Sequence, residues 1–166
     1  MRSLDNFNKV KITTLAGYIL KHFGPMSHLK LQKILFYCQA YHLAYFDKAL
    51  FNEDFEAWVH GPVCRDVYDI LKAKSVLYSD VTYTEYDFDA DIKLRESISE
   101  SQLEIIEDVL QELSSWTGAQ LEDATHSETP WLKARKNLSP NMHSANKISK
   151  KDMLEFYKAE VNEWKD

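Results

Sequence analysis

The pattern of apolar and polar residues along the chain predicts a mainly helical protein with one helix at its centre. Between Leu29 and Phe46, apolar and aromatic residues fall on every side of the helical wheel. Almost the only interruptions are Lys30, Gln32, Lys33 and Gln39. A helix that is apolar on all sides is covered by neighbours on most of its faces. We therefore expect residues 29–46 to form the central element of the core.

Amphipathic helices are predicted on both sides of this segment. The first has Thr13 or Thr14 as its N-cap and ends at Gly24-Pro25, because glycine and proline commonly follow the last helical turn. Another begins at Ser99, where Gln102 completes a capping box, and is closed by Gly118. The apolar residues of both segments recur at the three- and four-residue spacing of a helix.

Further helices are predicted in the C-terminal part of the chain. A short helix covers residues 121–124, and a second starts at Pro130 behind Thr129 as its N-cap. Residues 137–146 are expected to form a loop. The last helix is capped by Ser149, and its apolar face consists of Met153, Phe156, Tyr157, Val161 and Trp164.

Two stretches carry the features of β-strands. Residues 55–60 alternate between apolar and polar with the period of two that a strand requires. Residues 76–86 are rich in Tyr, Val and Thr, which predicts a second short strand or hairpin partner. Gly61 ends the first strand. Because proline has no N–H to leave unpaired, Pro62 suits the first position of a helix that runs to about Ala73.

Length and composition are consistent with one domain. The chain has 166 residues, of which 45% are hydrophobic, enough for one well-buried core. It contains only 4 glycines and 4 prolines, and no repeat or flexible linker divides it. The expected fold is mainly α: a single compact helical domain spanning 1–166, with its core at about 12–164 and a small β element at about 55–60 and 76–86.

Charge is distributed unevenly along the chain. The formal net charge of −6 disfavours a general affinity for nucleic acid or for anionic membranes. Residues 80–108 contain ten acidic side chains against Lys93 and Arg95, whereas residues 133–151 contain six basic side chains and no acidic one. An acidic surface would steer a basic protein partner, and the basic segment would suit phosphate. The ordinary alternative is that both are solvated surface.

The sequence lacks the usual motifs of metal, cofactor and enzyme sites. Cys38 and His42 have the spacing of two metal ligands on a helix, but no second pair completes a four-ligand shell. Asp87, Asp89 and Asp91 start like a calcium loop that lacks its required glycine and glutamate. Glycine-rich phosphate loops and nucleophile elbows are also missing. We therefore expect no metal, no cofactor and no catalytic residues.

The cysteine content and the N-terminal sequence favour a cytoplasmic protein. Only Cys38 and Cys64 occur, and neither belongs to a paired motif, so a disulfide framework is not expected. Residues 1–8 lack the apolar core of a signal peptide. No uncharged apolar run approaches the length that spans a membrane.

Two local clusters remain as candidate binding sites. In residues 58–62, a strand turns into a predicted helix start, where free N–H groups and an aromatic ring would hold an anionic or partner side chain. Residues 125–131, continuing to Arg135, are dense in hydrogen-bonding groups at another helix start. The alternative for both clusters is structural, because buried His and Trp side chains more often stabilise a fold than bind a ligand.

Around these clusters the sequence resembles the Panacea-domain, or SocA-like, antitoxins of bacteria and their phages, a family that includes phage-associated proteins named GepA. Residues 29–37 are similar to the family's signature helix, residues 50–63 to its next block and residues 125–135 to its late block. The similarity covers about residues 15–157. Cys38 departs from the pattern, since a small residue such as Ala is usual there.

The resemblance implies a non-enzymatic antitoxin of a type II toxin–antitoxin system that neutralises a co-encoded protein toxin by binding it directly. Residues 76–98 and 137–146 follow no family pattern, so variable surface that includes the acidic stretch 80–91 is expected to recognise the toxin. The candidate partner-binding residues are Trp58, His60, Asp80, Asp87, Asp89, Asp91, His126, Trp131 and Arg135.

Two alternative functions remain open. One gives His60, His126, Glu128 and Arg135 a shared cleft in which they hydrolyse or modify a small phosphate-bearing ligand, which requires these side chains to converge in space. The other is a phage accessory protein that binds a host protein, or DNA through residues 133–151. DNA binding is the less expected of these, because no helix-turn-helix with a basic recognition helix is evident. The sequence does not predict the oligomeric state.

Overall fold

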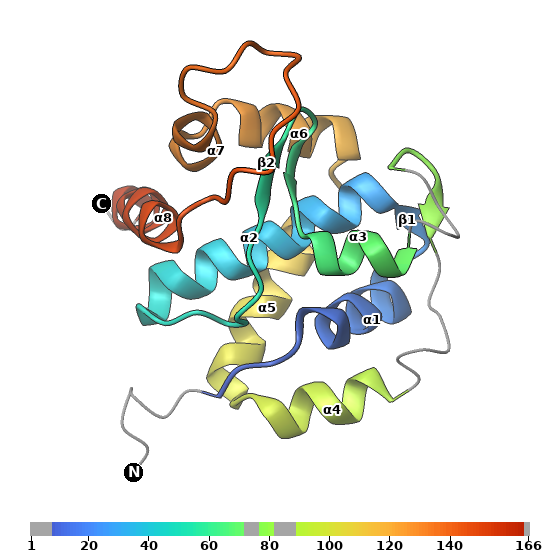
Figure 1. The fold of residues 1–166 in the computed structure, drawn as a ribbon. Coiled ribbons are helices and arrows are strands. Elements are labelled where there is room, and N and C mark those ends of the chain that lie inside the picture. The colour runs from blue at the N-terminus through green and yellow to red at the C-terminus, as the bar shows by residue number, and fades with distance from the viewer. Residues whose placement is uncertain (1–7, 72–76, 82–88, 165–166) are drawn as a thin grey trace.

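Helix α2 (His28–Phe46) passes through the middle of the fold and is surrounded by the other helices (Figure 1). The computed structural model of the chain describes residues 8–71, 77–81 and 89–164. From residue 28 to residue 44, every α2 side chain is buried except those of Lys30 and Tyr41, which are half-buried. The predictions of a mainly helical fold and of a buried central helix are both confirmed.

Three long helices cover α2: α1 (Ile12–Phe23), α5 (Glu100–Leu113) and α8 (Lys150–Trp164). Ser99 and Gln102 form the predicted capping box at the start of α5, with each side chain bonded to the other residue's backbone N–H. These caps are local in sequence, which is why the pattern alone could locate the start of this helix.

The start of α1 differs from the prediction. Its N-cap is Lys11, whose side chain does not cap the helix, instead of Thr13 or Thr14. The carboxylate of Glu53, from the loop after α2, accepts a hydrogen bond from the Ile12 N–H at 3.3 Å. A tertiary contact therefore takes the place of the local cap, and no pattern in the neighbouring residues indicates it.

The described residues also contain four shorter helices: α3 (Arg65–Leu71), α4 (Ala90–Ser97), α6 (Gly118–His126) and α7 (Thr129–Ala134). The prediction that Gly118 closes a helix is wrong, because Thr117 caps α6 and Gly118 is its first residue. Glu128 precedes α7 in the N-cap position that was expected for Thr129. Helix α4 begins at the end of the acidic stretch 80–91, and it packs on α1 through buried Ala90 and Leu94.

Strands β2 (Glu56–Trp58) and β3 (Gly61–Val63) form a short antiparallel hairpin over the N-terminal half of α2 (Figure 1). The loop before α8 runs along the other edge of β2, where the Ala57 N–H donates to the Asn146 carbonyl and the Ile148 N–H donates to the Phe55 carbonyl, both at 2.8 Å. A second small sheet pairs β1 (Met26–Ser27) with β4 (Asp80–Val81).

The predicted β element is therefore confirmed at residues 56–58, but its pairing was not foreseen. The partner of β2 is β3, and the described part of 76–86 pairs with β1 instead. Pro62 belongs to β3 and does not start a helix; α3 begins at Arg65. Because the loop before α8 lies along the far side of β2, β3 is the outer strand, and an edge position tolerates a proline that cannot donate a hydrogen bond.

The four polar interruptions of α2 each hold the backbone of another segment. Lys30 donates to the Ser114 carbonyl at 2.6 Å, and Lys33 donates to the Pro62 carbonyl at 2.8 Å. The amides of Gln32 and Gln39 each both donate to and accept from loop backbone, at residues 64 and 50–51 respectively. Because buried polar groups need partners, these side chains fix the loops that surround the central helix.

Candidate functional site

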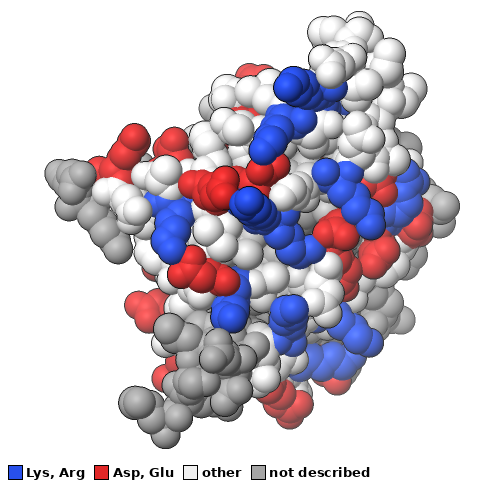
Figure 2. Space-filling model, turned by 60° about the vertical axis from the view of Figure 1, so that its left-hand side comes forward, with Lys and Arg blue, Asp and Glu red and all other residues white. Residues whose placement is uncertain are grey.

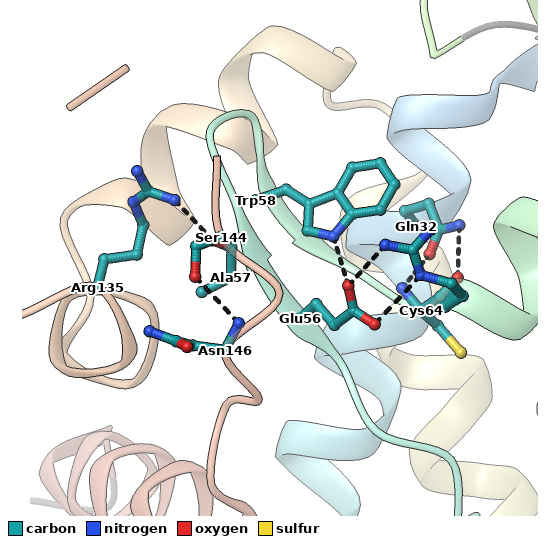
Figure 3. Close-up of polar contacts among 9 residues, drawn as sticks. Gln32, Glu56, Ala57, Trp58, Cys64, Arg135, Ser144 and Asn146 are labelled. Atoms are coloured by element: carbon teal, nitrogen blue, oxygen red, sulfur yellow. Dashed lines mark hydrogen bonds and ion pairs between the residues drawn. The ribbon is translucent and has the colours of Figure 1, made fainter. Parts of the chain in front are cut away.

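The β2–β3 hairpin is held by a network of side chains on one of its faces (Figure 3). The Glu56 carboxylate accepts hydrogen bonds from the indole N–H of Trp58 at 2.9 Å and from the Arg65 guanidinium at 3.1 Å. That guanidinium lies 5.1 Å from the centre of the Trp58 ring, a cation–π distance. Although partial burial opposes it, the hydrogen bonds from Arg65 and Trp58 hold the pKa of Glu56 below its usual value.

An open cleft of about 650 Å³ lies beside this hairpin. One wall is the hairpin itself with Trp58 and His60, and the opposite wall is the 141–145 segment with His143. The His60 ring, whose side chain is 45% exposed, lies 3.0 Å from the Tyr78 hydroxyl and 3.2 Å from the Glu122 carboxylate. Arg65 also lines the cleft, where its guanidinium is already paired with Glu56.

The residues of the second predicted cluster stabilise this hairpin. The Trp131 indole donates to the Trp58 carbonyl at 2.9 Å, and the His126 ring stacks on Trp131 with centroids 4.2 Å apart. Arg135 is buried and donates to the carbonyls of Ala57, Ser139 and Met142 at 2.7, 3.2 and 2.6 Å. These contacts give Trp131 and Arg135 a clear structural role, because their polar atoms already have partners inside the chain.

A buried lysine lies beneath the tip of the hairpin. Lys33 is fully buried, and desolvation lowers its pKa to about 7 although the carboxylate of Glu122 opposes the shift. Gly61 has φ 103°, and a Cβ at this position would lie 2.4 Å from Cε of Lys33 and 3.0 Å from Oγ1 of Thr125. Only glycine fits here, since both the backbone conformation and the contact with Lys33 exclude a side chain.

The candidate acidic residues lie outside the hairpin, and two of them form ion pairs. Asp91 is within 2.8 Å of the Lys21 amine and 2.7 Å of the His22 ring, and Asp89 pairs with Lys93. Asp80 is exposed in β4. Asp87 lies outside the described residues. The structure thus ties the acidic carboxylates at 89 and 91 to basic partners on α1 and α4.

The four side chains of the enzyme alternative do not converge. His60 lines the cleft, but Arg135 is engaged by three backbone carbonyls and His126 stacks on Trp131. Glu128 lies elsewhere, where its carboxylate accepts hydrogen bonds from the hydroxyls of Tyr37 and Tyr157. Burial raises the pKa of Glu128, and the two tyrosine hydroxyls oppose the shift.

The metal alternative also finds no support in the geometry. Both ring nitrogens of His42 contact polar groups, Nδ1 at 2.6 Å from the Lys48 carbonyl and Nε2 at 3.0 Å from the Gln102 amide nitrogen. Cys38 is fully buried. Within the described part of the chain, no group of three or more His, Cys, Asp and Glu side chains is placed to hold an ion.

A second hollow, of about 150 Å³, lies between α2 and α5 and was not predicted. We call it the tyrosine groove; its lining consists of Tyr41, Tyr45, Ile105, Asp108, Val109, Glu112 and Leu113. The sequence signal was present in the four-residue spacing of Tyr37, Tyr41 and Tyr45 on one face of α2. This spacing alone does not indicate a groove, because aromatic residues at this spacing are equally typical of a buried core.

Comparison with known families identifies the chain. Residues 31–132, more than half of the sequence, match the family described as antitoxin SocA-like, Panacea domain. The chain therefore belongs to this family, and the resemblance seen in the sequence is confirmed. The matched region contains most of α2, the β2–β3 hairpin, α5 and α6, whereas the 141–145 wall of the cleft lies beyond it. No match was found among curated proteins or among solved structures.

The helices of the described residues do not meet the requirements of a membrane span. None of them combines the length and the apolar composition that crossing a bilayer needs.

Proposed function

We propose that this protein is the antitoxin of a type II toxin–antitoxin pair and that it neutralises a co-encoded protein toxin by binding it directly in the cytoplasm of a bacterium. Its membership of the SocA-like antitoxin family is the observation that carries this proposal. The free cysteines Cys38 and Cys64, both buried, are compatible with a reducing compartment.

The surface chemistry of the molecule supports a binding role. The charged side chains around the hairpin are mostly engaged with each other, as in the Glu56–Arg65 pair, and hold a rigid scaffold. Exposed aromatic side chains, Tyr45 at 44% and Tyr78 at 64%, are available on its outside. Aromatic residues with a rigid backbone beneath them are typical anchors of protein interfaces.

The alternative of DNA binding through residues 133–151 is less well supported. Figure 2 shows basic and acidic side chains interspersed on the side of the molecule that carries α8. Four of the six basic residues of this segment form ion pairs with acidic ones: Lys133 with Asp152, Lys147 and Lys150 with Asp54, and Lys151 with Glu155. Since Arg135 is buried, little uncompensated positive charge remains to release counterions from a nucleic acid.

The proposal can be tested by inducible expression in a bacterial host of the product of each open reading frame adjacent to the gene. We expect one product to arrest growth alone, to be tolerated when this protein is co-expressed, and to copurify with it. A control plasmid carries this gene with an early stop codon, which separates protein binding from any effect of the RNA. If neither neighbour is toxic, or if protection occurs without copurification, direct neutralisation is excluded.

A further inference from the structure

The tyrosine groove has an apolar floor and an acidic rim. Tyr41 and Tyr45 of α2 and Val109 of α5 contribute apolar surface, and the carboxylates of Asp108 and Glu112 lie at its edge. Tyr45 is 44% exposed, whereas Tyr41 is half-buried and packs against Tyr37 and Tyr157. The exposed tyrosine is therefore the outer end of an aromatic row whose inner members are fixed in the core.

The acidic rim continues along α5 as a row of like charges, which we call the acidic ridge. Its four members are spaced by four residues and all exposed: Glu100, Glu104, Asp108 and Glu112. Carboxylates at this spacing lie side by side on a helix and repel each other. None of the four forms an ion pair with any residue that the structure describes, so no basic partner among those residues relieves the repulsion.

Several acidic residues elsewhere on the surface form ion pairs with basic residues from other segments. Asp54 pairs with Lys147 and Lys150, Asp91 pairs with Lys21, and Asp152 pairs with Lys133. The acidic ridge is thus an uncompensated anionic row beside an aromatic hollow. Burial and the charges of Glu128, Glu160 and Glu112 raise the pKa of Tyr41, so this ring of the groove lies near several carboxylates.

We propose that the tyrosine groove is the docking surface for a cationic segment of the toxin, in which one large apolar side chain enters the groove and flanking Lys or Arg side chains pair with the acidic ridge. This inference rests on the proposed antitoxin function and adds the place and the chemistry of the contact. Charge complementarity selects the occupant, because an acidic or neutral segment would leave the ridge unpaired. A hollow of about 150 Å³ is suited to a single anchoring side chain.

The test measures binding to the toxic neighbour product that the co-expression experiment is expected to identify. A groove variant carries Glu104→Gln, Asp108→Asn and Glu112→Gln, and a second variant carries Tyr45→Ala. We expect each variant to raise the dissociation constant about tenfold or more at 50 mM NaCl and to lose growth protection. We also expect the affinity of the wild-type complex to fall at 300 mM NaCl and that of the triple variant to change much less, because its charges are gone.

A matched control removes the same number of charges from other helices, by Asp66→Asn, Glu96→Gln and Asp123→Asn. This control is expected to bind within about twofold of the wild type, because net charge alone has little effect on a docked contact. Circular dichroism and thermal unfolding of every variant establish that each is folded before its binding is compared.

The outcomes separate the two proposals. If the wild type protects and the groove variants protect equally well, the antitoxin function stands and the groove assignment falls. Loss of binding by His60→Ala and His143→Ala, with the groove variants unaffected, would place the toxin in the hairpin cleft instead. A wild-type dimer that Tyr45→Ala dissociates in light scattering would show that a second copy covers the groove. If no neighbour product is toxic, both proposals fail.

Discussion

The amine of Lys33 on the central helix donates to the carbonyl of Pro62 at the tip of the β2–β3 hairpin, over a distance of 2.8 Å. This contact places an ionisable amine in a fully buried position, with Gly61 next to it and the Glu122 carboxylate near enough to favour the charged form. The hairpin therefore depends on an amine whose charged form is disfavoured by burial. The stability of the fold should for this reason depend on pH.

Lys33→Met should change how the free energy of unfolding depends on pH. The pKa of Lys33 is about 7 in the folded chain, whereas an unfolded lysine titrates at about 10.4. Between pH 7 and pH 9 the unfolded chain thus binds a proton that the folded chain has released, so the free energy of unfolding of the wild type rises with pH. The expected rise is at most about 1.4 kcal/mol per pH unit, and Lys33→Met should remove it.

Urea unfolding at pH 7, 8 and 9 measures this slope. Lys136→Met, at an exposed lysine, is the matched control and should keep the wild-type slope. Parallel stability profiles for the wild type and Lys33→Met would contradict the prediction, since they would mean that Lys33 keeps an ordinary pKa in the folded state.

Gly61→Ala should be strongly destabilising. The backbone at residue 61 has φ 103°, and the new Cβ would lie 2.4 Å from Cε of Lys33. We expect a loss of about 2 kcal/mol or more in the free energy of unfolding. Gly118→Ala is the comparison: it lies in the first turn of α6, its nearest contact would be Ser27 Oγ at 3.2 Å, and it should change stability by less than about 1 kcal/mol. Equal effects would refute the steric argument.

Arg135→Lys should destabilise the 137–146 loop as well as the hairpin. The guanidinium serves three carbonyls on two segments, and a single ammonium cannot reach all of them. We expect a loss of about 3 kcal/mol in the free energy of unfolding. Limited proteolysis should show new cleavage within residues 137–146, and Lys136→Gln, at the exposed neighbouring position, should leave both measurements unchanged. Unaltered proteolysis of the variant would show that Arg135 does not fix this loop.

Removal of a charge from the acidic ridge should stabilise the isolated protein. Asp108→Asn relieves repulsion with Glu104 and Glu112, so the free energy of unfolding should increase by about 0.5–1 kcal/mol at low salt. The gain should vanish at about 1 M NaCl, where charges are screened over about 3 Å. Asp123→Asn on α6 has no carboxylate four residues away and should show no gain. A salt-independent effect would mean that repulsion is not its cause.

Local patterns predicted much of the secondary structure, because the information lies within a few residues. The Ser99–Gln102 capping box and the apolar circumference of residues 29–46 were sufficient to locate α5 and α2. The errors occurred where distant residues decide. Glu53 replaces the expected cap of α1, and Pro62 lies in a strand, where its carbonyl accepts from Lys33 of the central helix.

The candidate partner-binding residues lie in different parts of the fold. Trp58 and His60 line a cleft, Trp131 and Arg135 donate to the backbone of the hairpin, and Asp89 and Asp91 form ion pairs. Residues 80–108 contain an excess of acidic side chains, and this is visible in the sequence. The sequence does not indicate which of those carboxylates form ion pairs with basic residues from other segments.

The sequence by itself determined the helical class, the buried centre and the family, because periodicity, composition and ordered motifs are properties of the chain. Only the tertiary structure decided which polar residues are engaged and which are free. Lys33 and Arg135 donate to buried backbone carbonyls, whereas Asp108 and Glu112, beside Tyr45, form no ion pair within the described residues. The physical reason is that hydrogen bonds and ion pairs form between segments far apart in sequence, at distances that only packing sets.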